Sequence, residues 1–216
     1  MGTAVEPIVM DVHLPAGVAG PDPLDFDVRC FLITHADGVA LVDVGMAGSR
    51  DAVDAALSRV GATWDDITDV LLTHGHPDHV GGLADVMASA ARAAIWVGDG
   101  DRPAIPFDGQ MQSLVERRTV RGLRAVQTPG HTPGHTSLVL EGESVLFAGD
   151  VVGSIGGSMS RGPAPFTADA ELAEKSLQRV ASLDFDRLLF GHGAEISDPL
   201  AELQNLLRHP EPRPPD

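Results

Sequence analysis

The feature that most constrains this chain is a dense cluster of histidines directly after a predicted strand. Residues 73–79 read Thr-His-Gly-His-Pro-Asp-His, so three of the nine histidines fall within six residues. Imidazole and carboxylate groups are standard ligands of zinc and related divalent metals. A polar turn with solvated histidines is the alternative interpretation, but chance clustering of this kind is rare. The run therefore predicts half of a metal site, or parts of two, and the fold must bring further ligands to it.

The spacing within the run indicates how its side chains point. His74 and His76 are two residues apart, so on an extended strand end they lie on the same side. Pro77 prevents simple continuation of that strand. A turn at Pro77 directs Asp78 and His79 back toward a point near the first pair. All four side chains are therefore candidate metal ligands.

Size and charge exclude several classes of protein. The chain has 216 residues, 43% of them hydrophobic, which suits one domain with a sizeable core. The net charge of −16 disfavours nucleic acid as a partner. Cys30 is the only cysteine, so an internal disulfide and a cysteine-based zinc site are excluded. Residues 1–10 lack a basic stretch followed by a long apolar run, so we expect no signal peptide, no membrane anchor and a cytoplasmic enzyme.

Apolar patterning predicts strands and helices in alternation. The predicted strands are Ile8–His13, Asp27–Thr34, Val39–Val44, Val70–Thr73, Ala93–Val97, Leu123–Gln127, Ser137–Leu140, Ser144–Ala148 and Arg187–Phe190. The predicted helices are Ser49–Val60, Gly82–Ala90, Ala168–Ser182 (with Thr167 as its cap) and Pro199–Leu207. Residues 210–216 hold four prolines and are expected to form a disordered tail, which leaves a single domain over residues 1–209. Composition and periodicity alone indicate only one domain containing both α and β structure.

Further candidate residues occur where apolar segments end. Asp43 follows Leu-Val, and Asp150 follows Phe-Ala-Gly. His131 and His135 lie in the rigid segment Thr-Pro-Gly-His-Thr-Pro-Gly-His, and His192 follows Leu-Leu-Phe-Gly. Each alone would be weak evidence, because a strand-end Asp or His is usually a turn residue. Together with the histidine run, however, the motifs form an ordered set that spans most of the chain.

This ordered set resembles the signature of the metallo-beta-lactamase superfamily. The resemblance implies an α/β fold, a four-layered αβ/βα sandwich with a metal site along one edge of its two sheets. It also implies two metals: the first is bound by His74, His76 and His131, the second by Asp78, His79 and His192, and Asp150 bridges them. In the same family Asp43 supports the site without binding metal. His135 is expected in a supporting role or in the pocket wall, and a ligand role for His135 is the competing assignment.

Such a site predicts hydrolysis without a serine or cysteine nucleophile. Two divalent metals about 3.5–4 Å apart can share a hydroxide and polarise a carbonyl or phosphoryl oxygen of the substrate. Asp78 is the candidate catalytic residue, since it lies beside the nucleophile and can steer it or transfer a proton. Zinc is the default cofactor because His and Asp ligands suit it, and iron and manganese are alternatives.

This chain differs from several known branches of the family at residues of the site, and these differences narrow the range of expected reactions. Zinc beta-lactamases generally lack the bridging Asp, and flavodiiron proteins carry Glu where this chain has His76. Persulfide dioxygenases bind one iron through two His and an Asp. Acyl-homoserine lactonases usually carry a tyrosine after the bridging Asp, and this chain has no tyrosine. Glyoxalase II enzymes add a C-terminal helical region, whereas only residues 193–216 follow the last motif.

We therefore predict a dinuclear hydrolase of the glyoxalase II-like or lactonase-like branch, acting on a small thioester, lactone or ester. The alternatives are a mononuclear iron enzyme that resembles persulfide dioxygenases and a phosphodiesterase of the same superfamily. The expected partner is a small molecule, not nucleic acid or membrane. The sequence leaves the oligomeric state open.

Substrate selection is expected in loops around the metals. Residues 153–166 form the longest irregular stretch near a ligand and are predicted to line the pocket. The candidate contacts in this stretch are Ser154, Met159, Arg161 and Phe166, with Arg161 as a contact for an anionic substrate. Met46 is expected on the opposite side. A flexible Gly/Ser/Pro loop without a binding role is the alternative.

Overall fold

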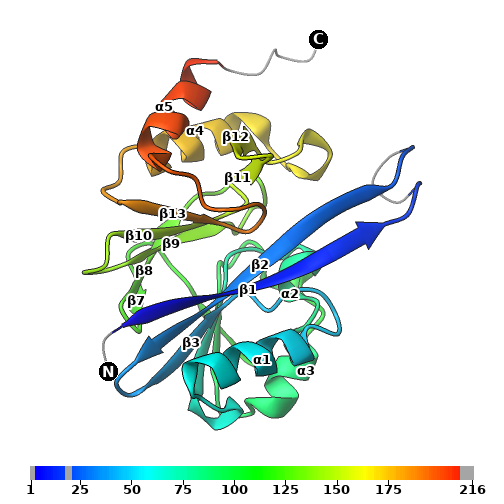
Figure 1. The fold of residues 1–216 in the computed structure, drawn as a ribbon, viewed down its shortest axis with the longest axis vertical. Coiled ribbons are helices and arrows are strands. Elements are labelled where there is room, and N and C mark those ends of the chain that lie inside the picture. The colour runs from blue at the N-terminus through cyan, green and yellow to red at the C-terminus, as the bar shows by residue number, and fades with distance from the viewer. Residues whose placement is uncertain (1–2, 18–20, 210–216) are drawn as a thin grey trace.

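In the computed structural model, two β-sheets pack face to face and helices cover their outer faces (Figure 1). The structure describes residues 3–17 and 21–209. The first sheet contains, in spatial order, β1 (Ala4–Leu14), β2 (Leu24–His35), β3 (Gly38–Val42), β4 (Ile67–Leu72), β5 (Ala94–Val97) and β6 (Met111–Ser113). The second contains β13 (Arg187–Phe190), β10 (Val145–Gly149), β9 (Thr136–Leu140), β8 (Leu123–Gln127) and β7 (Thr119–Val120). A separate hairpin pairs β11 (Val152–Ile155) with β12 (Ser158–Arg161).

Four of the described helices lie between strands in the chain, and α5 follows the last strand. The helices are α1 (Arg50–Val60), α2 (Pro77–Val80), α3 (Leu83–Ser89), α4 (Ala170–Val180) and α5 (Pro199–Arg208). Short 3-10 turns occupy Trp64–Asp66, Arg102–Ala104 and Ala164–Phe166. Within the described ranges, none of these helices has the length and apolar character needed to cross a membrane.

Alternating side chains on the strands of the first sheet feed two different cores. On β2, Leu32 packs with residues of α1 and α3, whereas Phe31 and Ile33 face the second sheet. The period of two follows from the pleat of an extended chain. Because both faces of β2 are buried over residues 30–33, that part of its sequence is a continuous apolar run.

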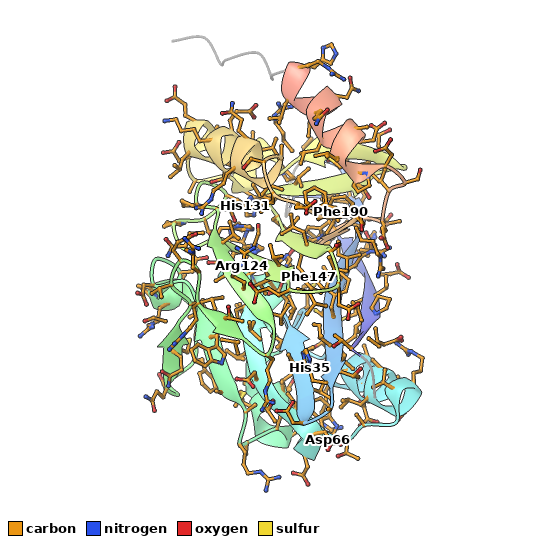
Figure 2. All side chains as sticks on the ribbon, turned by 90° about the vertical axis from the view of Figure 1, so that its left-hand side faces the viewer. His35, Asp66, Arg124, His131, Phe147 and Phe190 are labelled. Carbon is orange, nitrogen blue, oxygen red and sulfur yellow. The ribbon has the colours of Figure 1, made fainter. Side chains whose placement is uncertain are left out.

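The second sheet shows the same alternation. Phe147 of β10 faces the first sheet, and Figure 2 shows its side chain in the interior between the strands. The neighbouring Leu146 packs instead with Leu177 of α4 and Leu203 of α5. Three cores therefore separate four layers, helices–sheet–sheet–helices. The predicted four-layered αβ/βα sandwich is confirmed.

Each predicted strand and helix corresponds to an observed element, but residues 153–166 do not form the predicted irregular loop. This prediction was wrong, because Gly156 and Gly157 adopt positive φ angles of 58° and 83° and close a two-residue turn between β11 and β12. The predicted cap Thr167 was also wrong: Asp169 caps α4 and accepts a hydrogen bond from the Leu172 amide. The predicted disordered tail, residues 210–216, lies outside the described residues.

The topology brings several strand ends to one edge of the sandwich. The strands β3 and β4 run parallel, as do β10 and β13, so the carboxyl ends within each pair lie together. Asp43 follows β3 and His74 follows β4. Asp150 follows β10 and His192 follows β13. The candidate ligands from both sheets therefore converge at this edge.

Candidate metal centre

The histidine run turns back on itself through the single turn of α2. His76 occupies the N-cap and Pro77 the first helical position, where a missing N–H costs nothing. The amides of His79 and Val80 donate to the His76 carbonyl at 2.9 and 3.1 Å. This turn brings Asp78 and His79 beside the strand-end histidines, as the sequence predicts.

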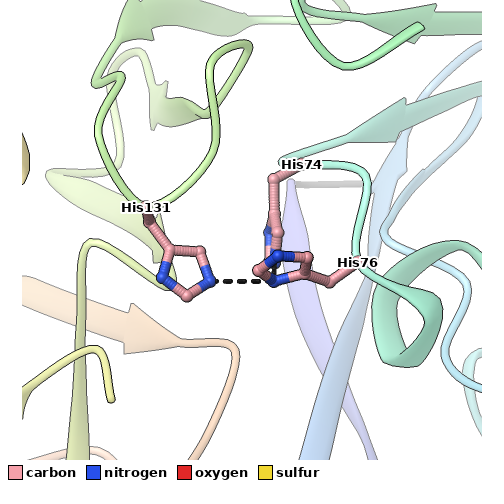
Figure 3. Close-up of side chains that lie close together, drawn as sticks. All are labelled: His74, His76 and His131. Carbon is pink, nitrogen blue, oxygen red and sulfur yellow. Dashed lines mark hydrogen bonds between the residues drawn. The ribbon is translucent and has the colours of Figure 1, made fainter. Parts of the chain in front are cut away.

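Three imidazoles form the first group of donors (Figure 3). His131 Nε2 lies 3.0 Å from His76 Nδ1, and His74 Nε2 lies 3.2 Å from the same atom. His74 and His131 are buried, while His76 is partly exposed. The three ring nitrogens therefore converge on one point that solvent can reach.

A second group combines Asp78, His79 and His192. His192 Nε2 lies 3.3 Å from both Asp78 Oδ2 and His79 Nε2. His79 Nε2 lies 3.8 Å from Asp78 Oδ2. His79 is fully buried, whereas the other two side chains are about a quarter exposed.

Asp150 reaches both groups with one carboxylate. Its Oδ2 lies 3.1 Å from His192 Nε2 and 3.5 Å from His131 Nε2, and its Oδ1 lies 3.4 Å from His79 Nε2. Among the described residues, the buried Oδ1 has no hydrogen-bond partner. An unpaired buried carboxylate oxygen is costly, and a cation between the groups would satisfy it. The donor set therefore fits divalent metal ions.

Asp43 fixes the orientation of His79. Asp43 adopts a left-handed backbone conformation, with φ at 56°. Its Oδ1 accepts the Thr73 amide at 2.7 Å, and its Oδ2 accepts a hydrogen bond from His79 Nδ1 at 2.9 Å. With Nδ1 donating to this carboxylate, Nε2 of His79 faces the second group. Burial opposes charge on His79, but the carboxylates of Asp150 and Asp43 raise its pKa well above the usual value, so a cation would displace the proton from Nε2. Positive φ in a residue with a side chain is uncommon and concentrates at functional sites.

His135 lies behind the site and contacts the backbone of the bridging residue. Its Nε2 accepts the Asp150 amide at 2.9 Å, and its Nδ1 lies 2.8 Å from Thr128 Oγ1. Both ring nitrogens are thus engaged, and His135 belongs to none of the donor groups.

Sequence reasoning missed Asp101, which joins the loops that carry His76 and His131. Its Oδ2 accepts the Gly75 amide at 2.9 Å and the Thr132 hydroxyl at 2.5 Å. Its Oδ1 accepts the Gly134 amide at 2.6 Å. The local sequence Asp-Gly-Asp reads as an ordinary acidic turn, so nothing in it distinguishes this residue.

Asp27, on β2, was missed as well. Its carbonyl accepts a hydrogen bond from His192 Nδ1 at 2.7 Å, and its Oδ1 accepts the Gly193 amide at 2.9 Å. Arg29 Nε in turn donates to Asp27 Oδ2 at 2.6 Å. The first sheet therefore orients the last ligand of the second.

Of the predicted substrate contacts, the structure brings only Phe166 to a cavity at the site. Phe166 is 44% exposed and lines a cavity of about 420 Å³ with His76 and His131. The other candidates do not line this cavity. Ser154 Oγ donates to the Ala194 carbonyl, and Met159 packs in the core under α4 and α5. Arg161 pairs with Glu174 at 2.8 and 3.0 Å, and Met46 is also absent from the cavity wall.

Burial keeps most of the imidazoles neutral. It lowers the pKa of His131 to about 4 and that of His135 to about 3, and it lowers the pKa of His74 as well. Burial opposes charge on His192 too, but the carboxylates of Asp150 and Asp78 raise its pKa to about 10. Neutral imidazoles offer the lone pairs that metal binding needs, and a cation would displace the proton from His192.

The pKa of Asp150 shows the opposite balance. Burial disfavours its charge, yet the imidazoles of His79 and His74 hold its pKa well below the usual range. The Asp150 carboxylate is therefore ionised at neutral pH and available to a cation.

A sandwich of this kind, with His and Asp side chains gathered at one edge of its two sheets, is a metal-binding α/β fold. The sequence profile of the metallo-beta-lactamase superfamily matches residues 24–192. The chain belongs to this superfamily.

Individual relatives differ in how much of their length this chain covers. The Bacillus subtilis (strain 168) protein YobT, described as uncharacterized, is 31% identical, and the match covers 86% of this chain and 91% of YobT. The hydroxyacylglutathione hydrolase of Nitrobacter hamburgensis is 35% identical, and the match covers 72% of this chain and 58% of the relative. The chain thus spans little more than half of that enzyme.

A solved structure agrees with this assignment. The di-iron-bound form of TTHA1623 superposes with a TM-score of 0.67 at 26% identity, covering 88% of this chain and 96% of that one.

Proposed function

We propose that this protein is a hydrolase that holds two divalent cations and cleaves a small thioester, lactone or other carboxylic ester. The observation that carries the proposal is the position of Asp150, whose carboxylate lies between the two groups of donors. Structural metal sites are usually closed, whereas His76, Asp78 and His192 remain partly exposed here.

Bound cations of this kind supply an ionised water at neutral pH and polarise the substrate carbonyl oxygen. The residues of the chain provide the rest. His76 and His131 form part of the cavity wall, so a substrate in the cavity contacts the first group of donors. The Asp78 carboxylate, about a quarter exposed, is placed to orient the attacking water or to accept a proton from it.

The relatives support this choice of reaction, and they are compatible with more than one metal. Hydroxyacylglutathione, named in one relative, is an acyl thioester, and that enzyme has a further region that this chain does not match. Zinc suits the His and Asp ligands, and the di-iron form of TTHA1623 makes iron the first alternative. The substrate is a small molecule and not a nucleic acid, since the net charge of −16 would repel phosphates.

The test compares lactoylglutathione and an acyl lactone as substrates for protein loaded with zinc, manganese or iron. We expect metal-dependent hydrolysis of at least one of them, lost in a His74→Ala variant. If protein with bound metal cleaves neither compound but does cleave a phosphodiester, the ester assignment is wrong. Iron-dependent oxygen uptake with a persulfide would replace the hydrolase with a dioxygenase.

A further inference from the structure

The cavity beside His76 and His131 has a wall that is largely apolar. At about 420 Å³ it lies near the lower end of the range for small-molecule sites. Its apolar lining comes from three different loops and consists of Pro103, Ala104, Pro133, Pro165, Phe166 and Ala168. Prolines and a single aromatic ring offer a stiff apolar surface with no side-chain hydrogen-bond donors.

The polar side chains of the wall, apart from the two histidines, already have partners within the protein. The Asp101 carboxylate accepts three hydrogen bonds and is 2% exposed. Thr132 Oγ1 donates to Asp101, and Thr167 Oγ1 donates to the Pro163 carbonyl at 3.1 Å. A substituent that needs hydrogen-bond donors, such as a carboxylate, would therefore lose water without gaining a donor from these side chains, which is unfavourable.

The side chains around the cavity supply no positive charge of their own. Among the residues that the structure describes, none of those lining it is Lys or Arg. The nearest arginines along the chain have acidic partners: Arg102 Nη2 pairs with Asp99 at 2.8 Å, and Arg161 pairs with Glu174. The proposed cations would supply positive charge at His76 and His131, where the scissile carbonyl group would bind. A carboxylate elsewhere in the cavity would find no cationic side chain to pair with, in a chain of net charge −16.

We propose that this cavity is the subsite for a neutral, apolar acyl group and that it discriminates against acyl groups bearing a carboxylate. The inference rests on the proposed hydrolase function and names its substrate class.

The test uses two thioesters of N-acetylcysteamine, a neutral thiol. The isocaproyl and succinyl thioesters differ only in an isopropyl group against a carboxylate of similar shape. We expect kcat/KM to favour isocaproyl by at least about 100-fold, because an unpaired carboxylate loses its hydration on entry. Equal rates, or a preference for succinyl, would overturn the inference while leaving the hydrolase assignment intact.

Two pairs of variants locate the preference in the cavity. Phe166→Ala should lower kcat/KM for the isocaproyl thioester about tenfold and leave the succinyl value nearly unchanged. Ile155→Ala, which truncates an apolar side chain that is 73% exposed and outside the lining, should change neither value. If both variants behave alike, the apolar group does not bind at Phe166.

The second pair alters charge at one position of the wall. Ala104→Arg should reduce the discrimination against succinyl by about tenfold or more, and Ala104→Glu should increase it. Equal effects of the two substitutions would show that electrostatics does not set the selectivity.

A binding measurement keeps the inference testable if neither thioester is cleaved. Ligand-detected NMR would compare isocaproamide with succinamate in the presence of the metal-loaded protein and of its Phe166→Ala variant. Binding of the neutral amide alone, weakened in the variant, supports the subsite even if the proposed reaction is wrong. Stronger binding of succinamate would contradict the subsite whatever the reaction.

Discussion

The two halves of the molecule, β1–β6 with α1–α3 and β7–β13 with α4 and α5, supply their candidate metal ligands in different ways. The first half delivers four of them from one turn between β4 and α3, namely His74, His76, Asp78 and His79. The second half delivers single ligands from three separated loops, namely His131, Asp150 and His192. The first set is arranged by local backbone geometry, whereas the second depends on how strands distant in the sequence pair in one sheet. We therefore expect the first set to tolerate changes elsewhere in the fold better than the second.

Asp150 and Asp101 are the side chains through which the two halves depend on each other. Asp150 comes from the second half and lies among ligands of both. Asp101 comes from the first half and accepts hydrogen bonds from the loop of each. Substitutions at these two positions should therefore reduce metal binding or activity more than chemically similar substitutions of residues that act within one half.

The largest effect is expected for Asp150→Ala. The variant loses the carboxylate shared by both groups, so kcat/KM should fall by about 100- to 1000-fold or more, as when a donor that stabilises charge in the transition state is lost. Metal content per chain, measured by atomic emission, should fall with it. Full activity at full metal content would contradict the bridging role.

Removing the metal should loosen the connection between the halves. At a free metal concentration about 1000 times the Kd, binding contributes about 4 kcal/mol of stability. For a chain of this size, chelation should lower the Tm by roughly 8–16 °C. The His74→Ala variant serves as the control, and its Tm should respond much less to the chelator. An unchanged Tm in the unmodified protein would mean that the halves dock without help from a cation.

Asp101→Asn tests the link without touching a ligand. The amide keeps the shape of the side chain but replaces one acceptor with a donor that faces backbone N–H groups. We expect metal affinity to fall about 10- to 100-fold, as for other residues that orient ligands. Asp99→Asn, two residues earlier and exposed, should leave the affinity unchanged, and a similar loss in both variants would argue against a specific role for Asp101.

The pH dependence of metal affinity should reflect the proton on His192. The pKa of His192 is raised to about 10 in the metal-free protein, so at neutral pH a cation must displace this proton. Affinity should therefore rise with pH, by at least about tenfold per unit below that pKa. Competition with a chromophoric chelator at several pH values measures the slope, and a flat profile would contradict the assignment.

The smallest effect on activity is expected at Arg161, within the second half. Its guanidinium binds Glu174 on α4 and the Leu206 carbonyl on α5. Arg161→Ala should lower the free energy of unfolding by roughly 1–2 kcal/mol and leave KM unchanged. A double-mutant cycle with Glu174→Ala measures the pair directly. A raised KM for an anionic substrate would restore the role predicted from the sequence.

The sequence predicted the features that depend on short-range pattern. Continuous apolar runs ending in Asp or His identified β3, β4, β10 and β13, because both faces of these strands are buried. The turn within the histidine run was predictable from Pro77, which both ends the strand and begins α2. The converging geometry of the remaining ligands came from the resemblance to a family and not from any local signal.

Features that depend on tertiary contact were not predictable in this way. Asp101 and Asp27 act through amides and imidazoles far away in the sequence, and their local segments look like any acidic turn or strand. The β11–β12 hairpin did carry a signal in Gly156-Gly157, but the surrounding Gly and Ser residues favoured a loop. Met159 was misjudged for the same reason, because the alternation that buries it becomes visible only once the hairpin is recognised.

The wide separation of the ligands in the chain has a consequence for how the protein is made. His79 and His192 approach within 3.3 Å although 113 positions separate them. A chain emerging from the ribosome presents its histidine run long before the last strand exists, and unfolded histidines also bind metals. Early capture of a cation by this run would compete with docking of the later half. Because His192 follows β13, the full set of donors comes together only when contacts between these distant segments close, which is a slow step in folding.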